Sequence, residues 1–441
     1  MEKEGNHLEI QIKSVVKKFL EESQEKEIQI ISHFDTDGIT SATIMIQTLQ
    51  KLDKKFSVKI LKNLEKEFIF QLPKNKLFLF LDLASGNLKE IHEAGLKNVF
   101  IIDHHEIKKE IPEGIKIINP ELGDKQKISS SGLTYLFCKE INPKNKEHAK
   151  LAVLGMIGDT LEKNLDKSNN NILNEGEIKK KRGLLIYPST RPLNRSLEYC
   201  SEPYIPGVTG ETQGVLELLR EAGLKPSQGK YKSLIDLNEK EMKNLVTAIM
   251  LKTPKIKIGD IFLIKFFNKI EDARELSAMI NACSRLGESG LAIQFCMENL
   301  KIKKKAESIY AKYKQLIISG LKYVSETEKI IGKGFTIINA KENIKETMIG
   351  TIASILSNSH SYEEGHIIIT MAYYKNKIKI SARNVGKKGR NLRELLNEII
   401  KNTGGEVGGH KHAVGGIILQ EKEKEFINTL KKNLEMELVK I

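Results

Sequence analysis

The stretch HFDTDG (residues 33–38) directly follows the apolar run IQII (28–31). A short apolar run with polar residues immediately behind it is typical of a buried strand that ends in a loop. Asp35 and Asp37 therefore lie together at the end of a predicted strand. Two carboxylates held that close repel each other, so positive charge must lie between them or one of them must take up a proton.

The same pattern recurs further along the chain. Strands are predicted in FSVKIL (56–61), KLFLFLDLASG (76–86) and NVFIIDHHE (98–106), and a helix in ITSATIMIQTLQKL (39–52). Continuous apolar strands separated by helices predict a parallel sheet covered on both faces, and ligands bind at the carboxyl ends of such strands. The polar residues at these ends, and at the end of the helical stretch HAKLAVLGMIGDT (148–160), are Asp82, Asp103, His104, His105 and Asp159.

Clustered acids at one sheet edge predict a metal centre. Carboxylate oxygens and an imidazole nitrogen are ligands that manganese or magnesium accepts. Two such ions, about 3.5–4 Å apart, polarise a phosphoryl group and lower the pKa of a bridging water, so phosphoester hydrolysis is the predicted chemistry. For Asp37 alone, helix capping is an equally good interpretation, and the ordered recurrence favours the metal. The predicted ligands of the two ions are Asp35, Asp37, Asp82, His104 and Asp159.

Composition sets broad limits on the class of protein. The 441 residues carry a formal net charge of +14, which favours a polyanionic partner, although a lysine-covered surface also serves solubility alone. No apolar run approaches the roughly 20 residues of a membrane span, and the start MEKEGNHLEIQIK lacks the pattern of a signal peptide. We therefore expect a cytoplasmic protein without membrane contact. Four widely spaced cysteines are expected to be core thiols.

The chain is expected to have three parts. NLDKSNNNILNEGEIKKKRG (164–183) is polar and basic and is predicted to be a loop or hinge. Turn-rich and helical segments follow, then one long amphipathic helix over 300–331. From 333 onward, strands, a hairpin, helices and a glycine-rich turn predict a compact α/β domain. The expected boundaries are 1–185, 186–332 and 333–441.

Several motifs resemble those of a known superfamily. HFDTDG, LDLASG (81–86), DHH (103–105) and GMIGD (155–159) are similar to motifs I to IV of the DHH phosphoesterases, and GGEVGGHKHAVGG (404–416) to the signature of the DHHA1 domain. NACSRLG (281–287) resembles the N-A-x-G-R-L motif of RecJ exonucleases, and residues 189–210 resemble the middle region of archaeal RecJ-like proteins. The resemblance implies an α/β fold: an N-terminal parallel-sheet DHH domain, a helical middle region and a C-terminal α/β DHHA1 domain.

The resemblance also implies roles for matching residues of the metal centre. Asp82 would bridge the two ions, Asp103 would orient the neighbouring histidines, and His105 would face the substrate phosphate or assist the leaving oxygen. His33 lies where bacterial RecJ has an acid close to the metal, and its role is left open. Ser284 departs from the RecJ motif, which has glycine there.

A second group is expected to bind substrate. Glycines let backbone N–H groups approach a phosphate, although a glycine-rich turn alone is more typical of a hairpin or a helix C-cap. Arg383, in SARN (381–384), can clamp a phosphate with two parallel hydrogen bonds. Arg191 is a further candidate for contacts with a nucleic-acid backbone, for which a solvated surface is the alternative. The expected set is His105, Asn281, Arg285, Ser381, Arg383, Gly408, Gly409, His410, Gly415 and Gly416.

The resulting hypothesis is a manganese-dependent exonuclease that releases mononucleotides from single-stranded DNA or RNA, with magnesium as an alternative ion. Two other hypotheses stay open. A phosphoesterase for small substrates would share the end motifs but does not need the middle region. A replisome scaffold, bound for instance to the GINS complex, would not need the acids and histidines. Neither the direction of digestion nor the choice between DNA and RNA is predicted.

Overall fold

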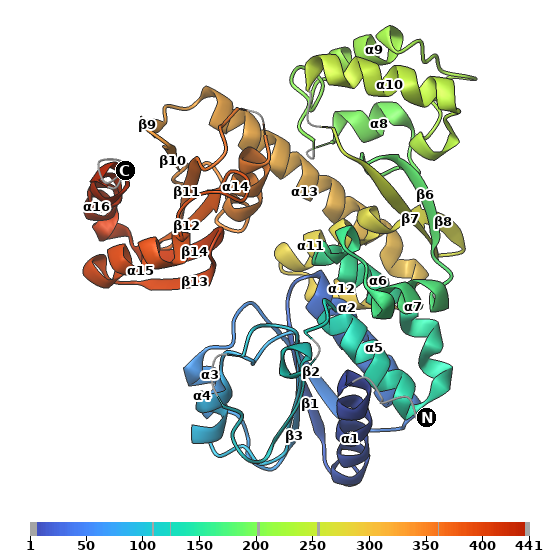
Figure 1. The fold of residues 1–441 in the computed structure, drawn as a ribbon, viewed down its shortest axis with the longest axis vertical. Coiled ribbons are helices and arrows are strands. Elements are labelled where there is room, and N and C mark those ends of the chain that lie inside the picture. The colour runs from blue at the N-terminus through green and yellow to red at the C-terminus, as the bar shows by residue number, and fades with distance from the viewer. Residues whose placement is uncertain are drawn as a thin grey trace. The chain divides into compact units, whose positions relative to one another are not determined.

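The structure is a computed structural model that describes residues 7–107, 110–123, 125–200, 203–253, 256–359 and 361–436. The chain forms two compact units (Figure 1): Met1–Arg182 with Asp260–Tyr310, and Gly183–Gly259 with Ala311–Ile441. The middle region expected over 186–332 is therefore divided between the units, and the expected three-part boundaries stay a prediction. None of the helices in the described part of the chain has the length and apolar character needed to cross a membrane.

The first unit contains the predicted parallel sheet, so the expected fold class is confirmed. Its strand order is β2-β1-β3-β4-β5. Neighbouring strands end level with one another, since His33 pairs with Leu61, and Leu81 pairs with Ser32 on one side and Ile102 on the other. The residues that follow these strands therefore meet at one edge. The bounds are β1 (Ile28–His33), β2 (Phe56–Leu61), β3 (Leu77–Leu81), β4 (Val99–Ile102) and β5 (Ile115–Ile118).

Helices cover both faces of this sheet (Figure 1). On one face, α3 (Lys66–Phe70) and α4 (Leu88–Glu93) pack on a core that includes Phe78 and Phe80. On the other face, Phe19 of α1 packs edge-on against Phe100 of β4. The further helices of the unit are α2 (Thr36–Lys51), α5 (Ser130–Ile141), α6 (Ala149–Gly158), α7 (Lys167–Glu175), α11 (Ala273–Arg285), α12 (Ser289–Cys296) and the start of α13 (Leu300–Glu326), with α1 spanning His7–Glu22.

The prediction of a loop or hinge over residues 164–183 is wrong, because the segment contains a helix and the start of a strand. Asp166 caps α7 by accepting a hydrogen bond from the Asn169 backbone, and Ile172 is buried. The basic residues that follow belong to β6 (Lys179–Leu184), in a three-stranded sheet of order β6-β7-β8 with β7 (Ile258–Phe266) and β8 (Lys269–Asp272). Side chains of Lys179–Arg182 are exposed, so the strand is held by its backbone and its sequence has no apolar pattern.

The second unit contains helices α8 (Leu193–Glu198), α9 (Thr212–Glu221) and α10 (Glu239–Lys252), and a six-stranded sheet of order β13-β14-β12-β11-β10-β9. Helix α14 (Ile349–Ser357) packs on one face of this sheet, and α15 (Leu392–Thr403) and α16 (Glu423–Met436) on the other. The strands are β9 (Ile330–Gly332), β10 (Phe335–Asn339), β11 (Ile367–Tyr374), β12 (Lys377–Asn384), β13 (Glu406–His410) and β14 (Ala413–Leu419).

The glycine-rich turn expected after α15 is instead mostly a strand, β13, which pairs antiparallel with β14. Positive φ angles occur at Gly404, Gly405 and Gly409. At Gly409, φ is +128°, and a Cβ atom would lie 2.4 Å from the Ala413 carbonyl oxygen. Only glycine fits there, because the close approach of the two backbones leaves no room for a side chain.

We predict that Gly409→Ala lowers the stability of the second unit by about 1–3 kcal/mol, because alanine is strained at this φ and its methyl group meets backbone. Gly408→Ala is the matched control, since none of the described atoms lies within 4 Å of a Cβ there. Urea unfolding of both variants, followed by circular dichroism, measures the difference. Equal stabilities of the two variants would contradict this account of the β13–β14 turn.

Candidate active site

The site begins where β1 passes into α2. Asp35 is the N-cap of α2, and its Oδ1 accepts a hydrogen bond from the Gly38 backbone at 3.0 Å. This tight turn requires glycine, because a Cβ at position 38 would lie 2.2 Å from the His33 carbonyl oxygen. The capping role considered for Asp37 therefore belongs to Asp35. Asp37 is free to enter the interior, where its side chain is fully buried.

Helices α5 and α6 both contact the side chain of Asp37. The first backbone N–H groups of α5 donate to its carboxylate, from Ser130 at 2.7 Å and from Ser131 at 3.0 Å. Helix α6 passes so close that a Cβ at Gly155 would lie 2.4 Å from Asp37 Oδ1 and 2.1 Å from Ser131 Oγ. Asp37 is thus held in one orientation, and a helix N-terminus stabilises its negative charge.

Asp82 occupies the centre of the site, directly after β3. Its φ of +59° is in the left-handed region, a conformation that costs about 1–3 kcal/mol for such a residue and is common at functional sites. Pairing of β3 with β4 maintains it, since the Asp82 backbone donates to the Ile102 carbonyl. Its carboxylate lies 3.3 Å from His33 Nδ1 and 3.6 Å from His104 Nε2. Asp82 therefore contacts groups on two sides of the cluster.

Asp103 fixes the loop that carries the histidines. One of its oxygens accepts from the Ser85 backbone, and the other from the backbone N–H groups of His104 and His105. The second oxygen also lies 2.7 Å from His105 Nδ1. Although burial acts to raise the pKa of Asp103, the His105 imidazole lowers it overall. Asp103 is thus ionised, and it orients His105 directly but His104 only through the backbone.

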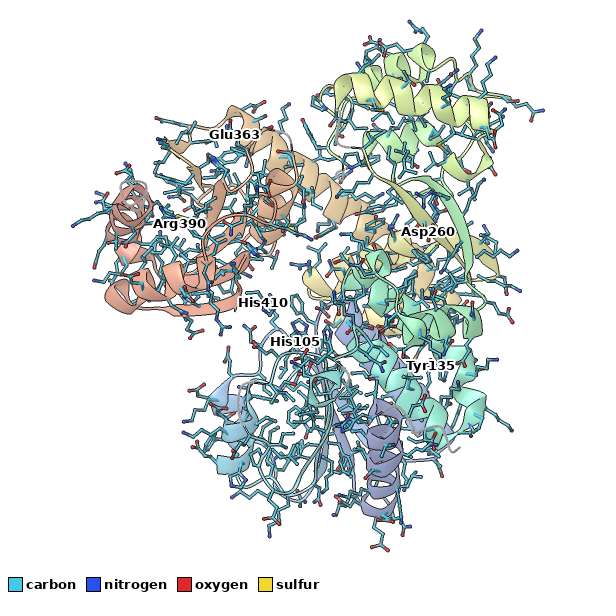
Figure 2. The ribbon with its side chains drawn as sticks, viewed as in Figure 1. His105, Tyr135, Asp260, Glu363, Arg390 and His410 are labelled. Carbon is cyan, nitrogen blue, oxygen red and sulfur yellow. The ribbon has the colours of Figure 1, made fainter. Side chains whose placement is uncertain are left out.

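The predicted ligands come together at the carboxyl edge of the sheet, which His105 marks in Figure 2. Three groups of side chains have ligand atoms within 4.8 Å of one another. In one of them, His105 Nδ1 is already bound by Asp103. The remaining two share no residue, and Asp82 in the first lies close to His104 in the second. These two groups are His33–Asp35–Asp82 and Asp37–His104–Asp159.

The electrostatics of the cluster show a deficit of positive charge. Burial and the neighbouring carboxylates raise the pKa of both Asp82 and Asp159 well above the usual range. Burial lowers the pKa of His104. Within the described part of the chain, the buried oxygens Asp82 Oδ1 and Asp159 Oδ2 have no hydrogen-bond partner. His104 Nε2 lies 3.3 Å from Asp159 Oδ2 but makes no hydrogen bond to it. Buried oxygens that accept no hydrogen bond are costly, and hard divalent cations fit them.

His33 and Asp35 form a pair at the more exposed side of the cluster. Burial acts to lower the pKa of His33 and to raise that of Asp35, but their contact at 3.0 Å has the opposite effect on both and dominates. Each group thus favours the charged form of the other. The sequence left the role of His33 open, and its Nδ1 lies close to both Asp35 and Asp82.

Helix α11 brings the predicted RecJ-like residues to the same unit. The Thr36 hydroxyl donates to the Ser277 carbonyl at 3.0 Å, which ties α11 to the start of α2. Arg285 Nε donates to Asn281 Oδ1 at 3.1 Å, and the guanidinium lies 5.7 Å from the centre of the Phe34 ring. The Ser284 hydroxyl contacts Ser289 at 2.9 Å, toward α12.

The other predicted substrate residues lie in the second unit. Strand register places Ser381 and Gly408 on either side of Gly415. The next row on this face contains Arg383, whose Nε donates to Ser354 Oγ at 3.0 Å, beside Ala413 and His410. Gly409 and Gly416 belong to the rows of the opposite face, where Gly416 approaches Ile400 of α15. Arg191 is half-buried in the loop before α8.

Several residues of the site were missed from the sequence. The backbone donors of Ser130 and Ser131 follow a serine N-cap, a recognisable start signal for α5. Gly155 and Phe34 give no such signal, because a glycine within an apolar helix and a phenylalanine within a polar motif acquire meaning only from what they contact.

The chain matches three domain families: the DHH family, N-terminal domain, over residues 27–158, the DHH-CID domain over 186–259 and the DHHA1 domain over 330–436. An uncharacterized protein of Methanocaldococcus jannaschii is 31% identical over 422 residues, which cover 91% of each chain. The single-stranded-DNA-specific exonuclease RecJ of Bacillus subtilis is 30% identical over 109 residues, 22% of this chain and 14% of that enzyme.

Two solved structures share the fold. Exonuclease RecJ bound to manganese superposes with a TM-score of 0.60 at 19% identity and covers 95% of this chain and 93% of its own. CDC45 from Entamoeba histolytica gives a TM-score of 0.69 at 12% identity, over 96% of this chain and 99% of its own. Together with the domain matches, the relative that is similar over almost its whole length shows that the chain belongs to the DHH/DHHA1 phosphoesterase superfamily and is related to RecJ.

Proposed function

We propose that this chain is a manganese-dependent exonuclease that hydrolyses phosphodiesters of single-stranded DNA or RNA and releases mononucleotides. One observation carries the proposal: two ligand groups without a common residue lie beside each other, with Asp82 between His33 and His104. The unpaired buried oxygens of Asp82 and Asp159 support it. So does the fold shared with exonuclease RecJ bound to manganese.

In the proposed metal centre, one ion binds among His33, Asp35 and Asp82, and the second among Asp37, His104 and Asp159. Asp82, which lies 3.6 Å from His104 Nε2, would help to hold both. Manganese fits this mixture of oxygen and nitrogen donors, and magnesium is the alternative. When bound, such a pair polarises a phosphoryl group and lowers the pKa of a bridging water.

His105 is proposed to act on the substrate. Its Nδ1 is held by Asp103, so Nε2 is the nitrogen available to a substrate oxygen, and the side chain is 43% exposed. Burial acts to lower the pKa of His105, but the Asp103 carboxylate raises it overall. A raised pKa favours the protonated imidazole, which donates a hydrogen bond to a phosphate oxygen or a proton to the leaving oxygen.

The proposed substrate contacts in the second unit lie on one face of its sheet. Gly408 and Gly415 leave a flat surface beside Ser381, and Arg383 and His410 lie in the adjacent row. Exposed backbone and a guanidinium suit a phosphate of a nucleic-acid strand. Contacts of Arg191, Gly409 and Gly416 with the substrate stay a prediction.

A scaffold role in a replisome is the second candidate. The fold shared with CDC45 over almost the whole of both chains favours it, and a GINS-type partner remains a hypothesis. Catalysis is the better-supported proposal, because a scaffold has no need for a buried cluster of acids in which the described oxygens Asp82 Oδ1 and Asp159 Oδ2 accept no hydrogen bond. The two roles are compatible in one chain.

We predict that purified protein with manganese shortens end-labelled single-stranded DNA or RNA to mononucleotides, and that a chelator stops the reaction. Chromatography of the products after short times measures this. Cleavage of a dinucleotide without attack on longer strands would favour the small-substrate alternative. No turnover of any of these substrates, despite manganese binding, would favour the scaffold.

We predict that Asp82→Asn abolishes turnover and makes the metal-free protein more stable near pH 8. A raised pKa means that the folded state holds a proton that the unfolded chain releases above about pH 3.9. This stabilisation is present below that pH and is lost as pH rises through the folded pKa. The amide removes the charge, so its advantage over wild type should grow from pH 5 to pH 8, by roughly 1–3 kcal/mol.

The measurement is urea unfolding in chelator at several pH values, with wild type as reference. The pKa values of Asp35 and Asp103 are lowered, so the stability that these two groups give the protein falls as pH falls. Subtracting the wild-type stability at each pH removes this background. Manganese should stabilise wild type and not the variant. A variant less stable than wild type at pH 8 would contradict this assignment.

We predict that Gly155→Ala weakens manganese binding about 10- to 100-fold, the range typical when a group that orients a ligand is disturbed. The added methyl group would displace the Asp37 carboxylate and the Ser131 hydroxyl. Gly290→Ala on α12 is the control, because a Cβ there has no described neighbour within 4 Å. Calorimetric titration with manganese compares them, and wild-type affinity in Gly155→Ala would disprove the role of this close approach.

A further inference from the structure

Two basic side chains lie near the ring of Phe34, next to the acid cluster. Phe34 stands between His33 and Asp35, and its ring is half-buried. The Arg285 guanidinium lies 5.7 Å from the ring centre, and Lys62 Nζ lies 6.0 Å from it. Both distances fall within the range of about 6 Å in which the face of an aromatic ring attracts a cation.

The fold explains why these groups meet. Strands β1 and β2 are parallel and pair His33 with Leu61, so the next residues, Phe34 and Lys62, leave the sheet edge beside each other. Arg285 comes from the last turn of α11. The His33 ring packs edge-on against Phe34, with centres 5.0 Å apart and planes at 84°. Phe34 thus contacts a proposed metal ligand and two cations.

Neither cation is neutralised by an acid. Among the described residues, Arg285 hydrogen-bonds only through Nε, to Asn281, and its two terminal nitrogens have no partner. Lys62 is exposed and makes neither a hydrogen bond nor an ion pair with the described residues. Two cations that lie on a fixed ring and lack counter-ions are well suited to bind an anion.

We propose that Phe34, Lys62 and Arg285 form a cation shelf that binds a phosphate next to the one that is hydrolysed. This inference rests on the proposed function, in which two divalent ions already balance the charge of the reacting phosphate. Two further positive charges match the neighbouring phosphate of a strand. The shelf therefore selects substrates with at least two phosphates along the chain, and Phe34 is a positioning residue that holds Arg285 in place.

The test is a double-mutant cycle on binding of a fluorescent single-stranded oligonucleotide, measured by anisotropy with calcium in place of manganese. Phe34→Leu removes the ring but keeps an apolar side chain, and should weaken binding about two- to fivefold. Phe34→Tyr keeps the ring and should bind within about twofold of wild type. Arg285→Ala should cost about tenfold or more. Adding Phe34→Leu to it should weaken binding less than Phe34→Leu does alone, because the ring then holds only Lys62.

Two further variants sharpen the test. Lys62→Ala should weaken binding and reduce the slope of log affinity against log salt by about one. Phe70→Leu is the matched control, because Phe70 is 48% exposed on α3 and has Lys66 at 5.5 Å from its ring. It makes the same chemical change at a cation–ring pair outside the shelf, and should leave oligonucleotide binding unchanged.

A kinetic comparison separates positioning from general damage. With manganese, Phe34→Leu should raise KM for a 5′-phosphorylated dinucleotide more than KM for bis(4-nitrophenyl) phosphate, which has a single phosphate. Equal effects on the two substrates would overturn the shelf, as would a loss in Phe34→Leu that persists undiminished in Arg285→Ala. A Phe34→Tyr variant as weak as Phe34→Leu would overturn it too.

The shelf and the proposed hydrolysis fail in different ways. If the protein binds the oligonucleotide with the expected coupling but hydrolyses no phosphodiester, the proposed function is wrong and the shelf stands. If it hydrolyses strands but Phe34 and Arg285 contribute independently, the shelf is wrong and the hydrolysis stands. Absence of any oligonucleotide binding by wild type would overturn the shelf directly.

Discussion

Mutual repulsion among buried carboxylates is the constraint on which the first unit depends. The parallel sheet brings Asp35, Asp37 and Asp82 to one edge, and the end of α6 adds Asp159. Their mutual repulsion raises the pKa of Asp82 and Asp159. Other features of the unit relieve this repulsion only in part. Helix α5 directs two N–H groups at Asp37, and Asp82 accepts an unusual backbone angle. A cluster of this kind costs stability, which is consistent with the proposed metal binding.

The proposed phosphate-binding groups are of two kinds. Near the acids, the available positive charge comes from Arg285 and Lys62, which are held by an aromatic ring and not by acids. An acidic partner would compete with the substrate, whereas a ring attracts the cation without neutralising it. In the second unit, glycine rows expose backbone on a flat sheet face beside Arg383.

The sequence predicted the parallel sheet and the gathering of the acids, because continuous apolar strands with polar ends have few other interpretations. It did not predict β6, whose exposed lysines are ordered by backbone pairing. It also predicted a turn where Gly408 and Gly409 lie in a strand, because glycine content alone does not distinguish a loop from a closely packed hairpin. The close approach at Gly155 depends on the packing of α6 against α2 and α5, which no local pattern records.

The first unit is built from two segments that are far apart in the chain. Thr36 and Ser277, which tie α2 to α11, are separated by 241 positions, and the helices of residues 183–259 are synthesised between them. During translation at about 5–20 residues per second, the sheet and its acids leave the ribosome well before Asn281 and Arg285 exist. A nascent chain therefore carries an acidic edge that has Lys62 but still lacks Arg285, and completion of the proposed site is delayed until α11 docks.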